Sequence, residues 1–228
     1  MLSDSVFASE SLFVVGNVNR DIKTAPLRPG SALFEDGERH VAWIEETIGG
    51  GGAHAAAAAA ALGAKAALAG KIGTDALGRR LGAALARPNV ELRLCLDPAV
   101  ATGTSINLSY ESCRRHFLSC LPNNEALRFE DLDLAGLGSF EHLYRADVWF
   151  SESMLQGGNR RLFEAAKQAG VAVSLDLNWD PLWETADDES IARRKQAVRE
   201  LLPLVHMAHG SIRELNRFAG CRNLARAL

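Results

Sequence analysis

The sequence has few cysteines, no long apolar run and no obvious targeting segment. Its four cysteines are spread over 228 residues without a CxxC pair, which is too sparse for a disulfide-stabilised scaffold and favours reduced thiols. The first residues contain acids and serines where a secretory signal needs a basic start and a long apolar stretch. No segment reaches the length of a membrane span. We therefore expect a cytoplasmic protein with no membrane partner.

An excess of positive charge is also missing. The chain carries 25 Lys and Arg against 28 Asp and Glu, a formal net charge of -3, so it lacks the basic surface that nucleic-acid binding requires. What the chain does have is 47% hydrophobic residues, enough for a substantial core. We expect a single α/β domain over residues 1–228 whose partner is a small molecule and not nucleic acid.

Apolar segments alternate with helix-forming segments along much of the chain. This alternation predicts a parallel sheet with helices on both faces. The predicted strands are residues 12–18, 66–69, 148–151, 171–175 and 205–208, and the predicted helices follow the glycines at 49–52 or cover 75–85, 159–169, 190–202 and 211–218. Two segments, about 22–48 and 91–121, instead contain β-prone pieces separated by turn residues. We expect them to form a small β-sheet lid.

Polar side chains follow several predicted strands. They are Asn17, Asn19 and Asp21 after the first strand, Glu152 after a later one, and Asp176 and Asn178 after the next. Because parallel strands end at one edge of a sheet, ligands bind there. Amides and carboxylates hydrogen-bond well to vicinal hydroxyls, which predicts a sugar or polyol site. For any single residue, capping of the following turn is the alternative.

Four consecutive glycines at 49–52 precede an alanine-rich segment interrupted by His54. A P-loop would need Gly-Lys-Ser/Thr after the glycines, and that sequence is absent. A dinucleotide-binding fingerprint fits poorly, because the acidic residue expected after the next strand is missing, which disfavours a nicotinamide-dependent enzyme. We expect a glycine loop that enters a helix whose free N–H groups suit an oxygen-rich ligand.

This glycine pattern resembles the first signature of the ribokinase, or PfkB, family of carbohydrate kinases. The matching positions are Gly49, Gly50, Gly52, Ala56, Gly63 and Gly73, with His54 in place of the family's Asn. The likeness extends from residue 12 to about 220. It implies a ribokinase-like fold with a β-sheet lid, and ATP-dependent phosphorylation of a sugar hydroxyl.

The resemblance also implies particular contacts. The implied sugar-binding residues are Asn19, Asp21, Gly50, Gly51, His54, Arg115, Glu152 and Asn178. Asp180 stands where many relatives carry Arg, which argues against an acidic sugar. Glu214 matches the metal-linked position of an Asn-x-x-Glu motif whose Asn is replaced by Ser211. ATP and Mg²⁺, with a monovalent cation as a further candidate, are the implied cofactors, and a homodimer through the lid is the implied assembly.

The Gly-Ala-Gly-Asp motif of the family, which holds the anion hole and the general-base Asp, does not occur in these residues. No catalytic residue is therefore assigned, and we expect the chain to be the amino-terminal two-thirds of the fold, without its C-terminal ATP-binding part. The alternative is a non-catalytic sugar-binding or dimerisation remnant. In either case, a sheet that stops early should leave apolar surface uncovered and promote self-association.

Overall fold

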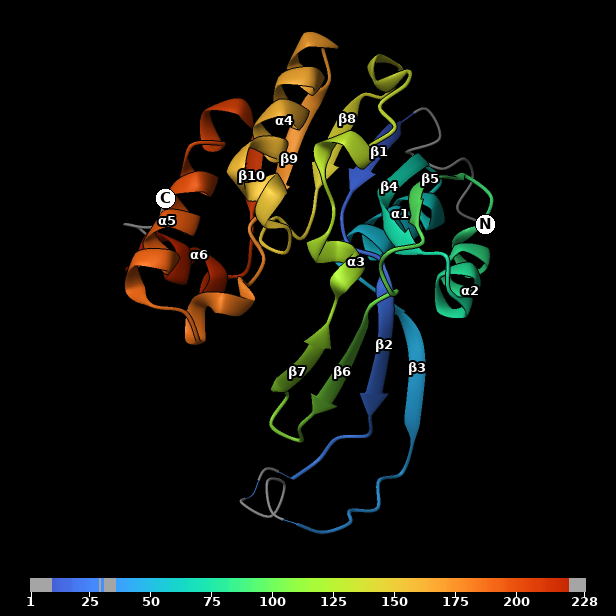
Figure 1. Ribbon diagram of the computed structural model, residues 1–228, viewed down its shortest axis with the longest axis vertical. Helices are drawn as coiled ribbons and strands as arrows, with labels where there is room; N and C mark the ends of the chain where they lie inside the picture. The colour runs from blue at the N-terminus through green and yellow to red at the C-terminus, as the bar shows by residue number, and fades with distance from the viewer. Residues whose placement is uncertain (1–9, 29, 31–35, 222–228) are drawn as a thin grey trace.

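A six-stranded parallel sheet forms the main body of the computed structural model, which describes residues 10–28, 30 and 36–221 (Figure 1). The strand order is β10-β9-β8-β1-β4-β5, and each neighbouring pair is parallel. The strands are β1 (Ser11–Val15), β4 (Lys65–Gly73), β5 (Val90–Asp97), β8 (His142–Arg145), β9 (Ala172–Asp176) and β10 (Met207–His209). The α/β class predicted from the alternating pattern is confirmed.

Helices cover both faces of this sheet because successive residues of each strand point to opposite sides. Phe13 and Val15 of β1 face a core cluster that contains side chains of α4 and α5, whereas Val14 faces a second cluster built with α1 and α2. The helices are α1 (Gly51–Ala61), α2 (Ala76–Leu85), α3 (Pro122–Glu125), α4 (Asn159–Gln168), α5 (Asp188–Arg199) and α6 (Ile212–Ala219). In the described part of the chain, no helix is long and apolar enough to span a membrane.

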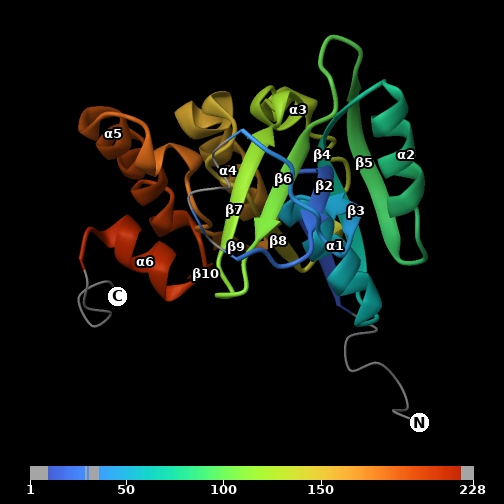
Figure 2. The same cartoon turned by 90° about the horizontal axis from the view of Figure 1, so that it is seen from below.

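A second, four-stranded sheet extends from one end of the main sheet and forms the predicted lid (Figures 1 and 2). Its order is β3-β2-β6-β7, with β2 antiparallel to β3, parallel to β6, and β6 antiparallel to β7. The strands are β2 (Asn19–Thr24), β3 (Ile44–Gly49), β6 (Thr104–Ser109) and β7 (Arg115–Cys120). Because β2 begins shortly after β1 ends, the lid starts at the carboxyl edge of the main sheet.

Several predicted boundaries differ from the structure, and two segments differ in kind. The second lid segment was expected to begin near residue 91, but residues 90–97 form β5, which pairs in parallel with β4 and packs Leu92 and Leu94 against the α1–α2 side. A strand was expected at 148–151, but the strand lies earlier, at β8. Val148 and Trp149 belong to the loop that follows β8, and their apolar side chains are buried in the core.

Small residues allow α1 to lie directly against the end of β1. A Cβ on Gly52 would lie 2.7 Å from the Cα of Gly16, and Ala53 and Ala56 of the same helix are buried. No side chain larger than hydrogen fits at Gly52 without moving backbone. This close approach places the glycine loop beside the carboxyl end of β1.

We expect Gly52→Ala to destabilise the fold by about 1–3 kcal/mol, because the added methyl group must displace backbone in a packed core. Gly82→Ala is the matched control, since Gly82 is also helical but a Cβ there would meet its nearest atom, Ile72 Cδ1, only at 3.9 Å. That control should be neutral or gain up to ~1 kcal/mol from helix propensity. Urea unfolding measures both, and equal losses for the two variants would contradict the packing argument.

Candidate functional site

Asn19 and Asp21 form a buried polar pair at the base of the lid. The Asn19 Nδ2 donates to Asp21 Oδ1 at 2.8 Å, and Gly49 lies opposite Asn19 on β3. A Cβ on Gly49 would fall 2.1 Å from Asp21 Oδ1, so the glycine makes room for this carboxylate. The pair is held on rigid strands, as a specific binding site requires.

The electrostatic surroundings of Asp21 bring two further predicted residues to this pair. Burial raises the pKa of Asp21, while electrostatic interactions with Lys23, His54 and Arg115 oppose that rise. His54 lies in the first turn of α1, and its Nε2 is 3.0 Å from the carbonyl oxygen of Ile48. Asp21 is therefore within electrostatic range of His54 and Arg115, and amide, carboxylate, imidazole and guanidinium groups can all hydrogen-bond hydroxyl groups.

The glycine loop has a backbone that only glycine tolerates. Gly50 has a φ of 98°, and a Cβ there would lie 2.2 Å from the Asn17 carbonyl oxygen. We expected the first N–H groups of α1 to be free for a ligand, but Gly52 N–H donates to Asp147 Oδ2 at 3.0 Å. A carboxylate of the chain itself therefore occupies this helix terminus.

Asp147 is the main residue that the sequence analysis missed. It follows β8, is 6% exposed, and has a φ of 55°. Its carboxylate accepts from Asn17 N at 2.9 Å and from Asn178 Nδ2 at 3.1 Å as well as from Gly52. Burial raises its pKa, and the N–H groups of Asn17 and Gly52 and the charge of Arg145 oppose this. Asp147 was missed because the strand was expected at 148–151, whereas β8 ends at Arg145 and Asp147 follows that strand end.

Asn178 is joined to the glycine loop through that carboxylate. Its backbone N–H donates to Asp176 Oδ1 at 3.1 Å, and its φ of 42° turns the chain sharply after β9. Asp176 also accepts from the Tyr144 hydroxyl at 3.2 Å. Burial and the nearby Asp176 both raise the pKa of Tyr144. The predicted residues Gly51 and Asn178 thus both border Asp147.

Glu152 is held elsewhere. Its Oε2 lies 2.8 Å from Arg194 Nη1 of α5, and the glutamate is half exposed, at 49% of its side chain. The same arginine binds the fully buried Asp180 through Nε at 2.8 Å. Glu152 is therefore the more exposed of two carboxylates that bind Arg194. Asp180 is the buried one, and its contact with Arg194 is structural.

The metal prediction at Glu214 fits poorly. Ser211 N–H donates to Glu214 Oε2 at 2.6 Å, and Glu214 N–H donates to Ser211 Oγ at 3.3 Å, so the two residues form the capping box of α6. Across the residues that the structure describes, no three His, Cys, Asp or Glu side chains are placed to hold a metal ion. Glu214 is therefore engaged in the cap of α6, and its assignment to a metal ion stays a prediction.

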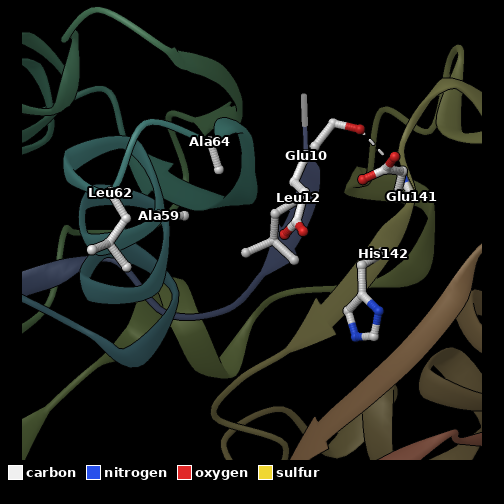
Figure 3. Close-up of a pocket in the computed structure, with 8 residues that line it drawn as sticks. Glu10, Leu12, Ala59, Leu62, Ala64, Glu141 and His142 are labelled. Carbon is white, nitrogen blue, oxygen red and sulfur yellow. Dashed lines mark hydrogen bonds between the residues drawn. The ribbon is translucent and has the colours of Figure 1, made fainter. Parts of the chain in front are cut away.

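A hollow lies at the other edge of the sheet (Figure 3). It measures about 410 Å³ and is lined mainly by apolar side chains, including Leu12, Ala59 and Leu62, with Glu141 and His142 at its rim. Residues 11 and 142 begin β1 and β8, so this hollow is at the amino edge. Because ligands of parallel sheets bind at the carboxyl edge, the candidate site remains beneath the lid.

The parallel sheet and its lid have the architecture of ribokinase-like kinases. A PfkB protein from Polaromonas sp. JS666 superposes with a TM-score of 0.73 at 21% identity, over 96% of this chain and 71% of that one. A fructokinase from Xylella fastidiosa gives 0.73 at 21% identity, over 92% and 64%. A candidate ribokinase II from E. coli, in complex with ATP and Mg²⁺, gives 0.73 at 19% identity, over 96% and 67%. Likeness at these identities shows the fold.

The family is established by the sequence itself. The model described as pfkB family carbohydrate kinase matches residues 9–227, so the chain belongs to the pfkB family. Comparison with curated protein sequences gave no match. The resemblance based on the glycine signature and the Asn19–Asp21 pair is therefore confirmed.

The two carboxylates on Arg194 should differ sharply in their contribution to stability. We expect Asp180→Ala to lower the free energy of unfolding by about 3–5 kcal/mol, because it leaves a buried guanidinium without its buried partner. Glu152→Ala removes a half-exposed partner and should lower it by less than ~1 kcal/mol. Urea unfolding of both variants tests this, and comparable losses would show that the buried pair has no special weight.

Proposed function

We propose that this chain binds a neutral sugar or related polyol beneath its lid and forms the sugar side of an ATP-dependent carbohydrate kinase. The observation that carries the proposal is the buried Asn19–Asp21 pair at the carboxyl edge, within electrostatic range of His54 and Arg115. Membership of the pfkB family supports the same reading.

In this proposal, Asp21 accepts hydrogen bonds from two adjacent hydroxyl groups, and Asn19 can donate and accept beside it. Gly50 allows the tight backbone turn that places the glycine loop against Asn17 at the end of β1. His54 takes the place of an amide with a ring that can donate or accept, according to its tautomer. Arg115, on β7 of the lid, offers further hydrogen-bond donors. A lid that carries contacts can exclude water once the sugar is bound.

ATP and Mg²⁺ are proposed as cofactors of the complete kinase. Support comes from similar structures, since a fructokinase from Xylella fastidiosa was solved with bound ATP and the candidate E. coli ribokinase II with ATP and Mg²⁺. Phosphoryl transfer depends on positioning and on neutralising charge at the transferred group. No residue described here is assigned to that step, and Glu214 is engaged in its capping box.

The alternative is a sugar-binding chain without phosphoryl transfer. Calorimetry of the 228-residue chain with a panel of neutral hexoses and pentoses, with and without a non-hydrolysable ATP analogue, tests both ligands. Binding of both supports the kinase. Binding of sugar alone is expected of the alternative and also of a kinase chain without its ATP-binding part, and a phosphorylation assay on any extension that the reading frame encodes then separates the two. No binding of any sugar would remove both.

Asp21→Asn should weaken sugar binding by roughly ten- to a hundredfold, because it removes a charged acceptor from hydroxyl hydrogen bonds worth ~1.5–3 kcal/mol. Glu46→Gln is the control, since Glu46 is paired with Ile22 on β2 and alternates with Asp21 onto the opposite lid face. Calorimetry with the tightest sugar of the panel measures both. Unchanged affinity in Asp21→Asn would place the sugar elsewhere.

We also propose that the lid mediates a homodimer. Ile22, Ile106 and Leu118 lie in one row across three lid strands, and Ile106 and Leu118 are 37% and 53% exposed. Such a row on one sheet face is apolar surface that a second copy can cover.

Ile106→Glu should convert the dimer to a monomer in light scattering, because a charge in the middle of this apolar row cannot be buried without a partner. Leu62→Glu, at the exposed carboxyl end of α1, should leave the mass unchanged. A wild-type monomer, or a dimer that survives Ile106→Glu, would argue against assembly through the lid.

A further inference from the structure

An N–H group in the first turn of α1 donates to a carboxylate of the chain itself, that of Asp147. The Oδ2 atom of Asp147 accepts from Gly52 N at 3.0 Å and from Asn17 N at 2.9 Å, and the Oδ1 atom accepts from Asn178 Nδ2 at 3.1 Å. Helix amino ends commonly bind external anions because their N–H groups lack partners. Here an internal anion fills that position.

We propose that Asp147 is a positioning residue, a built-in anion that fixes three loops of the candidate sugar site relative to one another. The loops follow β1, β3 and β9, and they contribute Asn17, Gly52 and Asn178 to the carboxylate. The proposal concerns the geometry of the loops themselves, and its bearing on sugar binding rests on the proposed function.

The backbone around Asp147 indicates that this arrangement is specifically maintained. Asp147 has a φ of 55°, a left-handed conformation that costs free energy for a residue with a side chain. A Cβ on Gly51 would lie 2.7 Å from its Oδ1 atom, so the neighbouring position must be glycine for the carboxylate to fit. Two unfavourable requirements are thus met at one point of the fold.

The buried charge has a nearby compensating charge. Arg145, two residues earlier, is buried and donates through Nε to Asn159 Oδ1 at 2.7 Å and through Nη1 to the carbonyl oxygens of Val15 and Ala146. Its positive charge acts on Asp147 without a direct ion pair. Arg145 is therefore fixed to the end of β1 and to Asn159 at the start of α4.

This arrangement has a consequence for substrate class. Because Asp147 already uses these N–H groups, they are not available to a carboxylate or phosphate on an incoming sugar. A negative group placed there would also meet the charge of Asp147. The site therefore favours a neutral sugar over the corresponding sugar acid or sugar phosphate.

The test removes the internal anion and offers an external one. Asp147→Gly keeps the left-handed backbone without strain and vacates the space in front of Asn17 and Gly52. We expect its thermal midpoint to fall by on the order of 10 °C, and formate, a small carboxylate, to restore about half of the loss at saturation. Formate should not raise the midpoint of the wild type, in which the position is filled.

Asp187→Gly is the matched control. Asp187 caps the exposed amino end of α5 by accepting from Ser190 N at 2.8 Å. Its removal also leaves a helix terminus without its carboxylate, but Asp187 does not connect separate loops. Formate should leave this variant unchanged. Equal effects of formate on all three proteins, or no effect on a folded Asp147→Gly protein, would overturn the proposal.

Two further measurements complete the test. If Asp147→Gly does not fold, Asp147→Asn preserves the shape but exchanges an acceptor for a donor; a midpoint equal to that of the wild type would then overturn the proposal. In sugar calorimetry, Asp147→Gly should lose at least tenfold in affinity and regain part of it with formate. If the wild type binds no sugar, the proposed function fails, while formate rescue of the midpoint still decides the role of Asp147.

Discussion

The direct contact between the backbone of α1 and the end of β1 is the constraint on which the candidate site depends. Gly16 and Gly52 meet without side chains between them, and this contact sets the position of the glycine loop relative to the carboxyl edge. The other groups of the candidate site are arranged around this contact. Asn19 and Asp21 follow β1 into the lid, Gly49 makes room for their side chains, and Asp147 reaches the first turn of α1 from β8. A larger residue at the contact would shift the loop away from all of these groups together.

The sequence predicted the features that depend on local chemistry. Alternation of apolar and helix-forming segments gave the parallel sheet, and the glycine spacing with Asn19 and Asp21 gave the family, now established over residues 9–227. The predictions were wrong where a buried apolar segment is not a strand, or where a strand belongs to a different sheet from the one expected. Val148 and Trp149 are apolar because they fill the core after β8 has ended, and residues 90–97 pair with β4 although they resemble a lid strand. Tertiary packing decided both cases, and no local signal carried that information.

The same error explains the uneven prediction of the site. The strand was predicted at residues 148–151, which put Glu152 directly after it. The actual strand, β8, ends at Arg145, so Asp147 is the carboxylate that follows the strand end. In the structure, Glu152 contacts Arg194, whereas Asp147 receives N–H groups from separate loops. Hydrogen bonds between residues that lie 95 or 130 positions apart cannot be inferred from spacing in one sequence. Asn19 and Asp21 lie two residues apart on β2, so their contact is local enough to be expected from the sequence; their role in binding stays a prediction.

The parallel pairing of β2 with β6 also affects how the chain folds. Residues 20–23 pair with residues 104–107, so the lid closes a loop of more than eighty residues that includes α1, β4, α2 and β5. The entropy of closing so long a loop is lost before the pairing offers any stabilisation, and contacts of this sequence separation slow folding. The hairpin of β6 and β7 can form early because its strands are adjacent in sequence. The complete four-stranded lid must await the α1–β5 segment, so the proposed sugar-binding surface is expected to be among the last parts of the molecule to assemble.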